Sequence, residues 1–237
     1  MQDNSADDVR DRVAGGSRIA AEQEGFELGT PALVCRWRLS GGTLPMANRH
    51  LRALAVRSLD GVPVSTQLIA WAKQHIEWTL ADGTRRDPDG VLMLVVDDSG
   101  RAAMSCGPYE APLATSVSSL AERARRSQVE ATETGVAPET LWLVRGDTLA
   151  CGASPDSTAS GAASLIGDLA ATLGIPVVRE EGLVDSVIAG VATYDEAFLV
   201  SDEHGIVVAS DAPGEKSERF AGGYARLMEK ARGTSRP

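Results

Sequence analysis

The chain has 237 residues, of which 43% are hydrophobic and 24% are charged, values typical of a soluble globular protein with a core of its own. Its 23 basic and 33 acidic side chains give a net charge of −10, which repels phosphate backbones and argues against nucleic acid as a partner. No apolar run reaches the roughly 18–20 residues that cross a bilayer, so we expect a cytoplasmic protein without a membrane contact.

The first predicted segment is a flexible leader over residues 1–25, which is acidic and polar and lacks the apolar stretch of a secretory signal. The alternating pattern over 32–39 predicts a strand, and helices are predicted over 49–59 and 65–80. The longer of these two helices carries apolar residues at helical spacing, so one of its faces is expected to be buried.

The middle of the chain is predicted to form a hairpin and a long helix. The continuous apolar run 91–96 indicates a buried strand, which turns at 97–100 and returns over 101–106. A helix follows over 118–134, and the Ser-x-x-Glu pattern at 119–122 is typical of a capping box at its start.

The last part of the chain alternates short strands with helices. A small-residue helix is predicted over 158–173 and ends at Gly174. The other predicted elements are strands over 141–144, 175–178, 197–200 and 206–209, and helices over 183–189 and 217–232. This mixture predicts an α/β or α+β fold in two lobes, a smaller one over 26–112 and a larger one over 113–237.

The cysteines and histidines supply no metal-binding pattern. The three cysteines are widely spaced and form no CxxC pair, and the three histidines add no ligand spacing. We expect free thiols and no metal. These residues are Cys35, Cys106, Cys151, His50, His75 and His204.

Four short motifs give the chain a resemblance to a known family. They read WRLSGGTL at 37–44 with a following Arg-His-Leu, WLVRGDTL at 142–149, LAATLGIPV at 169–177, and DEAFLVS at 195–201 followed by GIVV. Their order is similar to that of the class IV aminotransferase and aminodeoxychorismate lyase family, also called pyridoxal phosphate (PLP) fold type IV. The resemblance implies a two-lobed, D-amino-acid-aminotransferase-like fold with a cleft between the lobes, and a homodimer.

The chemistry of that family needs one lysine, because PLP is held as a Schiff base on a primary amine. This chain has no lysine between Lys73 and Lys216, and the family's lysine position falls in the stretch 114–117. The phosphate-binding arginine of the family falls on Ala53, with Arg52 beside it. The family's glutamate on the pyridine nitrogen has no certain counterpart. From these departures we expect a degenerate member that has lost PLP chemistry and takes no cofactor.

The resemblance also implies where a ligand would bind. The family cups the cofactor phosphate at a helix N-terminus that corresponds to Thr158, Ser160 and Gly161, and an ordinary capped loop is the alternative for this Gly- and Ser-rich run. Arg49, His50 and Arg52 form a second basic cluster, which is either an anion anchor or a solvated helix face.

The turn that closes over the family's cleft contains Ser201 and His204, so these two are the candidate catalytic residues, with an exposed turn histidine as the alternative. The leading hypothesis is a small-molecule enzyme that uses acid–base chemistry on an anionic metabolite in the cleft. A catalytically silent subunit or binding module is the second hypothesis. Residual PLP-dependent transaminase or lyase activity is the third, and it would need Lys73 or Lys216 to reach the cleft.

Overall fold

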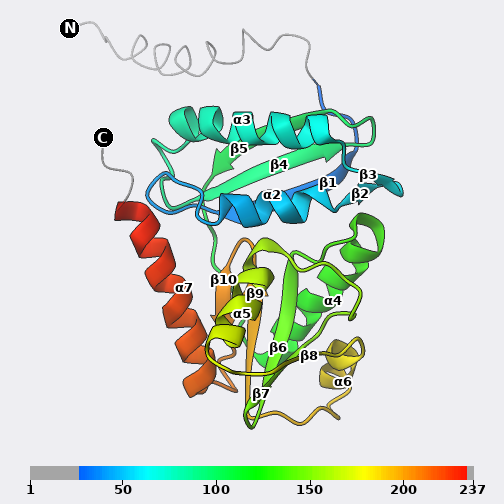
Figure 1. The fold of residues 1–237 in the computed structure, drawn as a ribbon, viewed down its shortest axis with the longest axis vertical. Coiled ribbons are helices and arrows are strands. Elements are labelled where there is room, and N and C mark those ends of the chain that lie inside the picture. Colours follow the sequence, from blue (N-terminus) through cyan, green and yellow to red (C-terminus); the bar gives the residue numbers. More distant parts are fainter. Residues whose placement is uncertain (1–26, 234–237) are drawn as a thin grey trace, which may run out of the picture.

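The computed structural model describes residues 27–233, so the predicted leader lies outside the described residues. The chain folds into two lobes, each built on its own sheet with helices packed against it (Figure 1). This arrangement confirms the α/β class with two lobes, while the exact lobe boundaries stay a prediction.

The first sheet has three antiparallel strands in the order β1-β4-β5. They are β1 (Pro31–Arg38), β4 (Val91–Asp97) and β5 (Ala102–Gly107). All three were predicted, because each is a short apolar or alternating run that ends at a turn. β4 lies in the centre, which explains why its sequence is apolar without interruption.

The two faces of β1 have different partners. Leu33, Cys35 and Trp37 are buried in the core of the first lobe. Because successive side chains of a strand point to opposite faces, Arg36 and Arg38 lie on the other face of the sheet, which is directed toward the second lobe.

Within residues 27–233, helices cover one face of this first sheet. They are α2 (Ala47–Ala55) and α3 (Thr66–Gly83), joined through a short hairpin of β2 (Ser58–Leu59) and β3 (Val62–Pro63). Ser65 caps α3, since its side chain accepts a hydrogen bond from the amide of Leu68 at 3.1 Å. The opposite face of the sheet is left to form part of a cleft.

The second sheet has five strands in the order β10-β9-β6-β7-β8. The strands are β6 (Glu139–Arg145), β7 (Thr148–Cys151), β8 (Val177–Arg179), β9 (Glu196–Ser201) and β10 (Gly205–Val208). All neighbours are antiparallel except β7 and β8, which are parallel.

Helices cover both faces of the second sheet. α4 (Val117–Thr134) and α6 (Leu183–Ile188) pack on one face, against the core side chains of β6 such as Leu141. α5 (Gly161–Thr172) and α7 (Glu215–Gly233) pack on the other face. In Figure 1, α7 runs along the side of the molecule from the second lobe toward the first.

One predicted cap is wrong. The side chain at the N-terminus of α4 that accepts a backbone hydrogen bond is Ser116, which accepts from the amide of Ser119 at 3.3 Å. Ser119 therefore lies in the first turn and Glu122 in the second, and they do not form a capping box. Glu122 pairs with Arg125 instead, at 2.9 Å.

Several contacts join the two lobes directly. The amide of Arg38 donates to the carbonyl of Asp202 at 3.0 Å, which attaches the end of β1 to the turn after β9. Arg49 on α2 forms an ion pair with Asp168 on α5 at 2.8 Å. Ser40 donates to the carbonyl of Met228 on α7 at 2.7 Å. These bonds fix the orientation of the lobes on either side of the cleft.

Candidate functional site

The cleft between the lobes contains three adjoining cavities of about 600, 400 and 360 Å³. They lie where the open face of the first sheet meets α4 and the turn after β9. Arg36 and Glu203 line all three cavities, so these residues mark the centre of the cleft.

Arginines from both lobes line the two larger cavities. Arg36 comes from the open face of β1, while Arg123 and Arg126 come from α4. The two α4 arginines are three residues apart, a spacing that places side chains on one face of a helix. Guanidinium groups are suited to carboxylates and phosphates because they present several N–H donors in one plane.

The same region contains glutamates that balance part of this charge. Arg123 pairs with Glu139 at 2.7 Å, and Arg36 pairs with Glu203 at 3.5 Å. Arg126 forms no ion pair with any residue between 27 and 233. The uncompensated positive charge on the α4 side of the cleft therefore lies at Arg126.

The remaining acidic residues of these cavities are mostly paired elsewhere. Glu122 pairs with Arg125 at 2.9 Å, and Glu130 pairs with Arg57 at 3.2 Å. Glu110 lines the cavity on the side away from α4, in the connection after β5. The cleft is thus a mixed-charge site in which glutamates hold most arginines in place.

His204 is the buried titratable group of the cleft, with a side chain only 6% exposed. Its Nε2 lies 2.6 Å from a guanidinium nitrogen of Arg123, and because arginine can only donate, Nε2 accepts. We therefore assign the neutral tautomer with its proton on Nδ1. Burial lowers the pKa of His204, and nearby Arg123 lowers it further against the opposing charge of Glu203. The Nδ1 atom is buried and has no hydrogen-bond partner.

Ser201 lies at the end of β9, in the same turn as His204, and its hydroxyl is fully used. It donates to Glu139 at 2.9 Å and accepts from the amides of Glu203 at 3.2 Å and His204 at 3.0 Å. A hydroxyl has one proton, which here goes to a carboxylate. The structure brings the two predicted catalytic residues together, with Ser201 in the bonding pattern of a positioning residue.

The N-terminus of α5 is occupied by a carboxylate of the chain itself. Ser160 caps the helix, and the amide of Ala162 donates to a carboxylate oxygen of Asp202 at 2.7 Å. Gly161 lies directly against the ring of His50, so that even a methyl group there would collide with it. Thr158 is exposed on the other side of the loop. The helix end that the resemblance assigns to a phosphate therefore already has an anion.

His50 and Asp202 form a buried pair at this junction, with His50 Nδ1 3.6 Å from a carboxylate oxygen of Asp202. The His50 ring also stacks on Trp37, with 5.3 Å between ring centroids. Burial alone would raise the pKa of Asp202, but the charge of His50 and the hydrogen bond from Ala162 together hold it below its usual range. The pair lies between α2, α5 and β9, on the opposite side of the turn from the cleft.

The predicted basic cluster on α2 does not gather in one place. Arg49 extends to α5, where it contacts Asp168 and the hydroxyl of Ser164. His50 is buried, and Arg52 is exposed. Neighbouring side chains of a helix diverge by about 100°, which explains this divergence. None of the three lines the cavities of the cleft.

The sequence interpretation missed the arginines that do line the cleft. Arg36, Arg123 and Arg126 were not among the candidate site residues. A usable signal existed for Arg36, since it alternates with the buried Cys35 and Trp37 and so had to face away from the first core.

Among the described residues, no cluster of three or more histidine, cysteine or carboxylate side chains is arranged to hold a metal ion. Within the same part of the chain, no helix combines the length and the apolar character needed to cross a membrane.

Comparison with known proteins gives matches in structure alone. No family model matches the sequence, and no curated protein matches it. A hypothetical aminotransferase from Mycobacterium tuberculosis in its PLP-bound form is similar in structure, with a TM-score of 0.55 and 13% identity over 90% of this chain and 96% of the other. A candidate 4-amino-4-deoxychorismate lyase from Legionella pneumophila has a TM-score of 0.51 and 13% identity over 89% of this chain and 97% of the other.

These likenesses show the fold, which is PLP fold type IV, as the resemblance predicted. They also correct the expectation that the protein takes no cofactor. The mycobacterial structures contain PLP in one form and PMP with α-ketoglutarate in another, the latter with a TM-score of 0.53. The fold therefore accommodates PLP, and the expectation of no cofactor is wrong.

The residues of this chain fit one part of PLP. The arginines of the cleft suit a phosphate, whereas the N-terminus of α5 already holds the carboxylate of Asp202. Ala114, in the stretch where the family has its lysine, does line the largest cavity of the cleft, but no described lysine lines any of the three cavities. Lys216 instead contacts the β6–β7 turn. The donor set fits the phosphate and not a covalent attachment.

Proposed function

We propose that this protein binds a small phosphorylated or carboxylated metabolite in the cleft between its lobes, and that PLP is one ligand of this class. The observation that carries the proposal is the set of arginines from two lobes, Arg36, Arg123 and Arg126, around a buried neutral histidine. An anion in the cleft would meet Arg126, whose charge has no carboxylate partner among residues 27–233.

The proposed role of His204 is to donate a hydrogen bond through Nδ1 to an oxygen of the bound anion. Nε2 is held by Arg123, so the ring is neutral and its one free polar atom is a donor. A neutral imidazole stabilises negative charge on a ligand oxygen without exchanging a proton. Ser201 and Glu139 keep the His204 turn and Arg123 in place. This arrangement supports binding and charge stabilisation by His204 more directly than proton transfer.

A binding module is the second candidate, and the bonding of Ser201 favours it. The hydroxyl of Ser201 donates to Glu139 and accepts from the amides of Glu203 and His204, which is the bonding of a side chain that holds its own turn in place. The homodimer implied by the resemblance is part of the same proposal, and sedimentation of the purified chain tests it.

The decisive experiment compares two neighbouring arginines of α4. Titration calorimetry would measure the binding of PLP and of inorganic phosphate to the wild type, to Arg126→Gln and to Arg125→Gln. Arg126 lines the cleft, whereas Arg125 is exposed and paired with Glu122. Losing one charge-assisted contact should weaken binding by about 10-fold in Arg126→Gln, and Arg125→Gln should match the wild type.

The proposal fails if neither anion binds the wild type, or if both variants lose affinity equally. Borohydride reduction of the PLP complex followed by mass mapping adds a second readout. Reversible binding through the arginines predicts no single modified lysine, whereas one stoichiometric adduct on Lys73 or Lys216 would support the PLP-enzyme alternative instead.

A further inference from the structure

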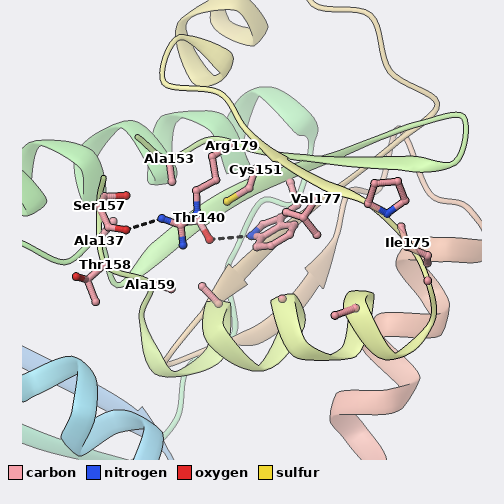
Figure 2. A pocket seen from close by; sticks show the side chains of 16 residues that line it. Ala137, Thr140, Cys151, Ala153, Ser157, Thr158, Ala159, Ile175, Val177 and Arg179 are labelled. Carbon is pink, nitrogen blue, oxygen red and sulfur yellow. Dashed lines mark hydrogen bonds between the residues drawn. The ribbon is translucent and has the colours of Figure 1, made fainter. Parts of the chain in front are cut away.

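A separate cavity of about 650 Å³ lies inside the second lobe, between α5 and the edge strands β7 and β8 (Figure 2). Thr140 and Trp142 of β6 line it, and these two side chains point to the face of the sheet opposite Glu139 and Leu141. The sheet therefore separates this cavity from the cleft, and the two spaces are independent.

The cavity exists because α5 offers no large side chain on this side. Ala163, Gly167 and Ala171 follow one another at four-residue spacing, so they form one stripe of the helix facing the cavity. A methyl group added at Gly167 would meet no atom within 4 Å. The space is comparable in size with ligand pockets of proteins, which hold about 300–1,000 Å³.

The walls are apolar, and their polar groups are few. Trp142 donates its indole N–H to the hydroxyl of Thr140 at 2.8 Å, so its polar edge is satisfied inside the protein. Figure 2 shows Thr140, Cys151 and Val177 on the strand side of the cavity, across from α5. The remaining lining residues, apart from Arg179, are Ala137, Ala153, Ser157, Thr158, Ala159, Ala163, Gly167, Ala171, Gly174, Ile175 and Pro176.

Arg179 is the single charged residue of this lining, and no aspartate or glutamate is part of it. Its guanidinium donates to the carbonyls of Ser154, Pro155 and Ser157, which hold it over the cavity (Figure 2). It forms no ion pair with any residue in the described range 27–233. Arg179 thus places a fixed positive charge without a carboxylate partner at the wall of an apolar space. The complementary ligand is an apolar molecule with one negative charge.

We propose that this cavity binds an aromatic monocarboxylate, with its ring against the small-residue stripe of α5 and its carboxylate at Arg179. The ring would cover the α5 stripe and the apolar side chains of Ile175 and Val177, of which Val177 is 37% exposed. The carboxylate of the ligand supplies the negatively charged partner that Arg179 lacks among the described residues. This site is independent of the anion site proposed in the cleft, because it lies on the other face of the sheet.

The first test compares 2-naphthoate with its neutral analogue 2-naphthamide by titration calorimetry. The two probes share a ring system and differ in charge. The wild type should bind the acid about 10-fold more tightly than the amide, because one charge-assisted hydrogen bond distinguishes them. Arg179→Gln should reduce that ratio to about 2-fold or less by removing the guanidinium. Equal affinity of both probes for the wild type would overturn the proposed charge recognition.

The second test fills the cavity without touching Arg179. Gly167→Leu places a side chain in the open space, and Gly223→Leu in α7 is the matched control, since that helical glycine also has no atom within 4 Å of an added methyl group. Both changes raise helix propensity, so both variants should fold. Gly167→Leu should weaken 2-naphthoate binding by at least about 10-fold, and Gly223→Leu should not change it.

Retained binding in Gly167→Leu, or no binding of 2-naphthoate to the wild type, would overturn the proposal. Arg126→Gln serves as the control that separates the two sites. It should bind 2-naphthoate as the wild type does, so a loss in this variant would place the probe in the cleft and also contradict the proposal.

Discussion

Ser201 and Asp202 are neighbours at the end of β9, yet they belong to two different environments. The side chain of Ser201 points to the α4 face and bonds Glu139 beside the cleft. The side chain of Asp202 points to the α5 face and bonds the amide of Ala162. Successive side chains of a strand point to opposite faces. The turn after β9 therefore contributes Asp202 to the closed junction with α5 and Ser201 to the open cleft.

The difference between the two environments lies in how charge is balanced. At the junction, a carboxylate, a helix N-terminus and His50 compensate one another within the protein. In the cleft, Arg126 has no ion-pair partner among the described residues. The helix end that could bind an anion is used for joining the lobes, and the anion site that we propose lies on the other side of the sheet.

Removing the carboxylate of the junction should give the largest effect. In Asp202→Ala, the buried amide of Ala162 loses its acceptor and His50 loses the carboxylate that lies 3.6 Å from its Nδ1. Asp202 is only 3% exposed, so the free energy of unfolding should fall by about 3 kcal/mol, as measured by urea denaturation.

Asp168→Ala is the matched control, because Asp168 also lies on the α5 side of the lobe contact but is exposed and pairs with Arg49. An exposed pair contributes little, so this change should cost less than about 1 kcal/mol. Similar losses of unfolding free energy in the two variants would show that the buried junction stabilises the protein no more than an exposed ion pair does.

Replacing the neighbouring serine tests the open side. Ser201→Ala removes one buried donor to Glu139 and the acceptor for the amides of Glu203 and His204, and should lower the free energy of unfolding by about 1–2 kcal/mol. The same denaturation experiment measures it. Ser186→Ala, which removes an exposed hydroxyl bonded to a carbonyl of its own helix turn, should stay within about 0.5 kcal/mol of the wild type.

Much of the fold could be predicted from the sequence because its signals are local. The apolar run of β4 and the alternating pattern of β1 each determine a strand, and the small-residue pattern before Gly174 determines α5. The start of α4 was predicted to within one residue, but its cap was misplaced because Ser116, three residues before Ser119, holds that position. Short-range patterns define elements better than they define the ends of elements.

The site was harder to predict because its residues are distant in sequence. Arg36, Arg123 and Glu203 meet only through the docking of two lobes, and no spacing rule connects them. The motif at 158–161 suggested an anion site, but sequence alone did not reveal that Asp202 would occupy it. That contact forms because Asp202 lies on the α5 face of the sheet at the end of β9. A shift of the strand by one residue would turn this side chain to the α4 face.

The smallest predicted effect is a pH dependence that separates the two sides of the turn. The folded-state pKa of His204 is lowered by burial, so the unfolded state binds more protons below about pH 6.5. Neutral His204 therefore stabilises the folded state fully above about pH 6.5. This stabilisation is lost as the pH falls from about 6.5 through the pKa of His204 in the folded state. Asp202 has a depressed pKa, so its contribution is lost only when the pH falls below about 3.9 toward the folded pKa.

Denaturation of the wild type and of His204→Gln between about pH 5 and pH 7.5 measures this difference, since that window contains the ordinary histidine pKa and excludes that of aspartate. The wild type should lose stability toward the acid end, and the variant should lose less because the titrating ring is gone. An equal slope in both proteins would assign the effect to another group. The charged and aromatic groups that face the ring, and that a variant could also perturb, are Glu203, Arg123, Glu139, Arg38 and Tyr109. A smaller slope in His204→Gln within this window, which lies above the depressed pKa of Asp202, would show that the His204 side of the turn titrates independently of the Asp202 junction.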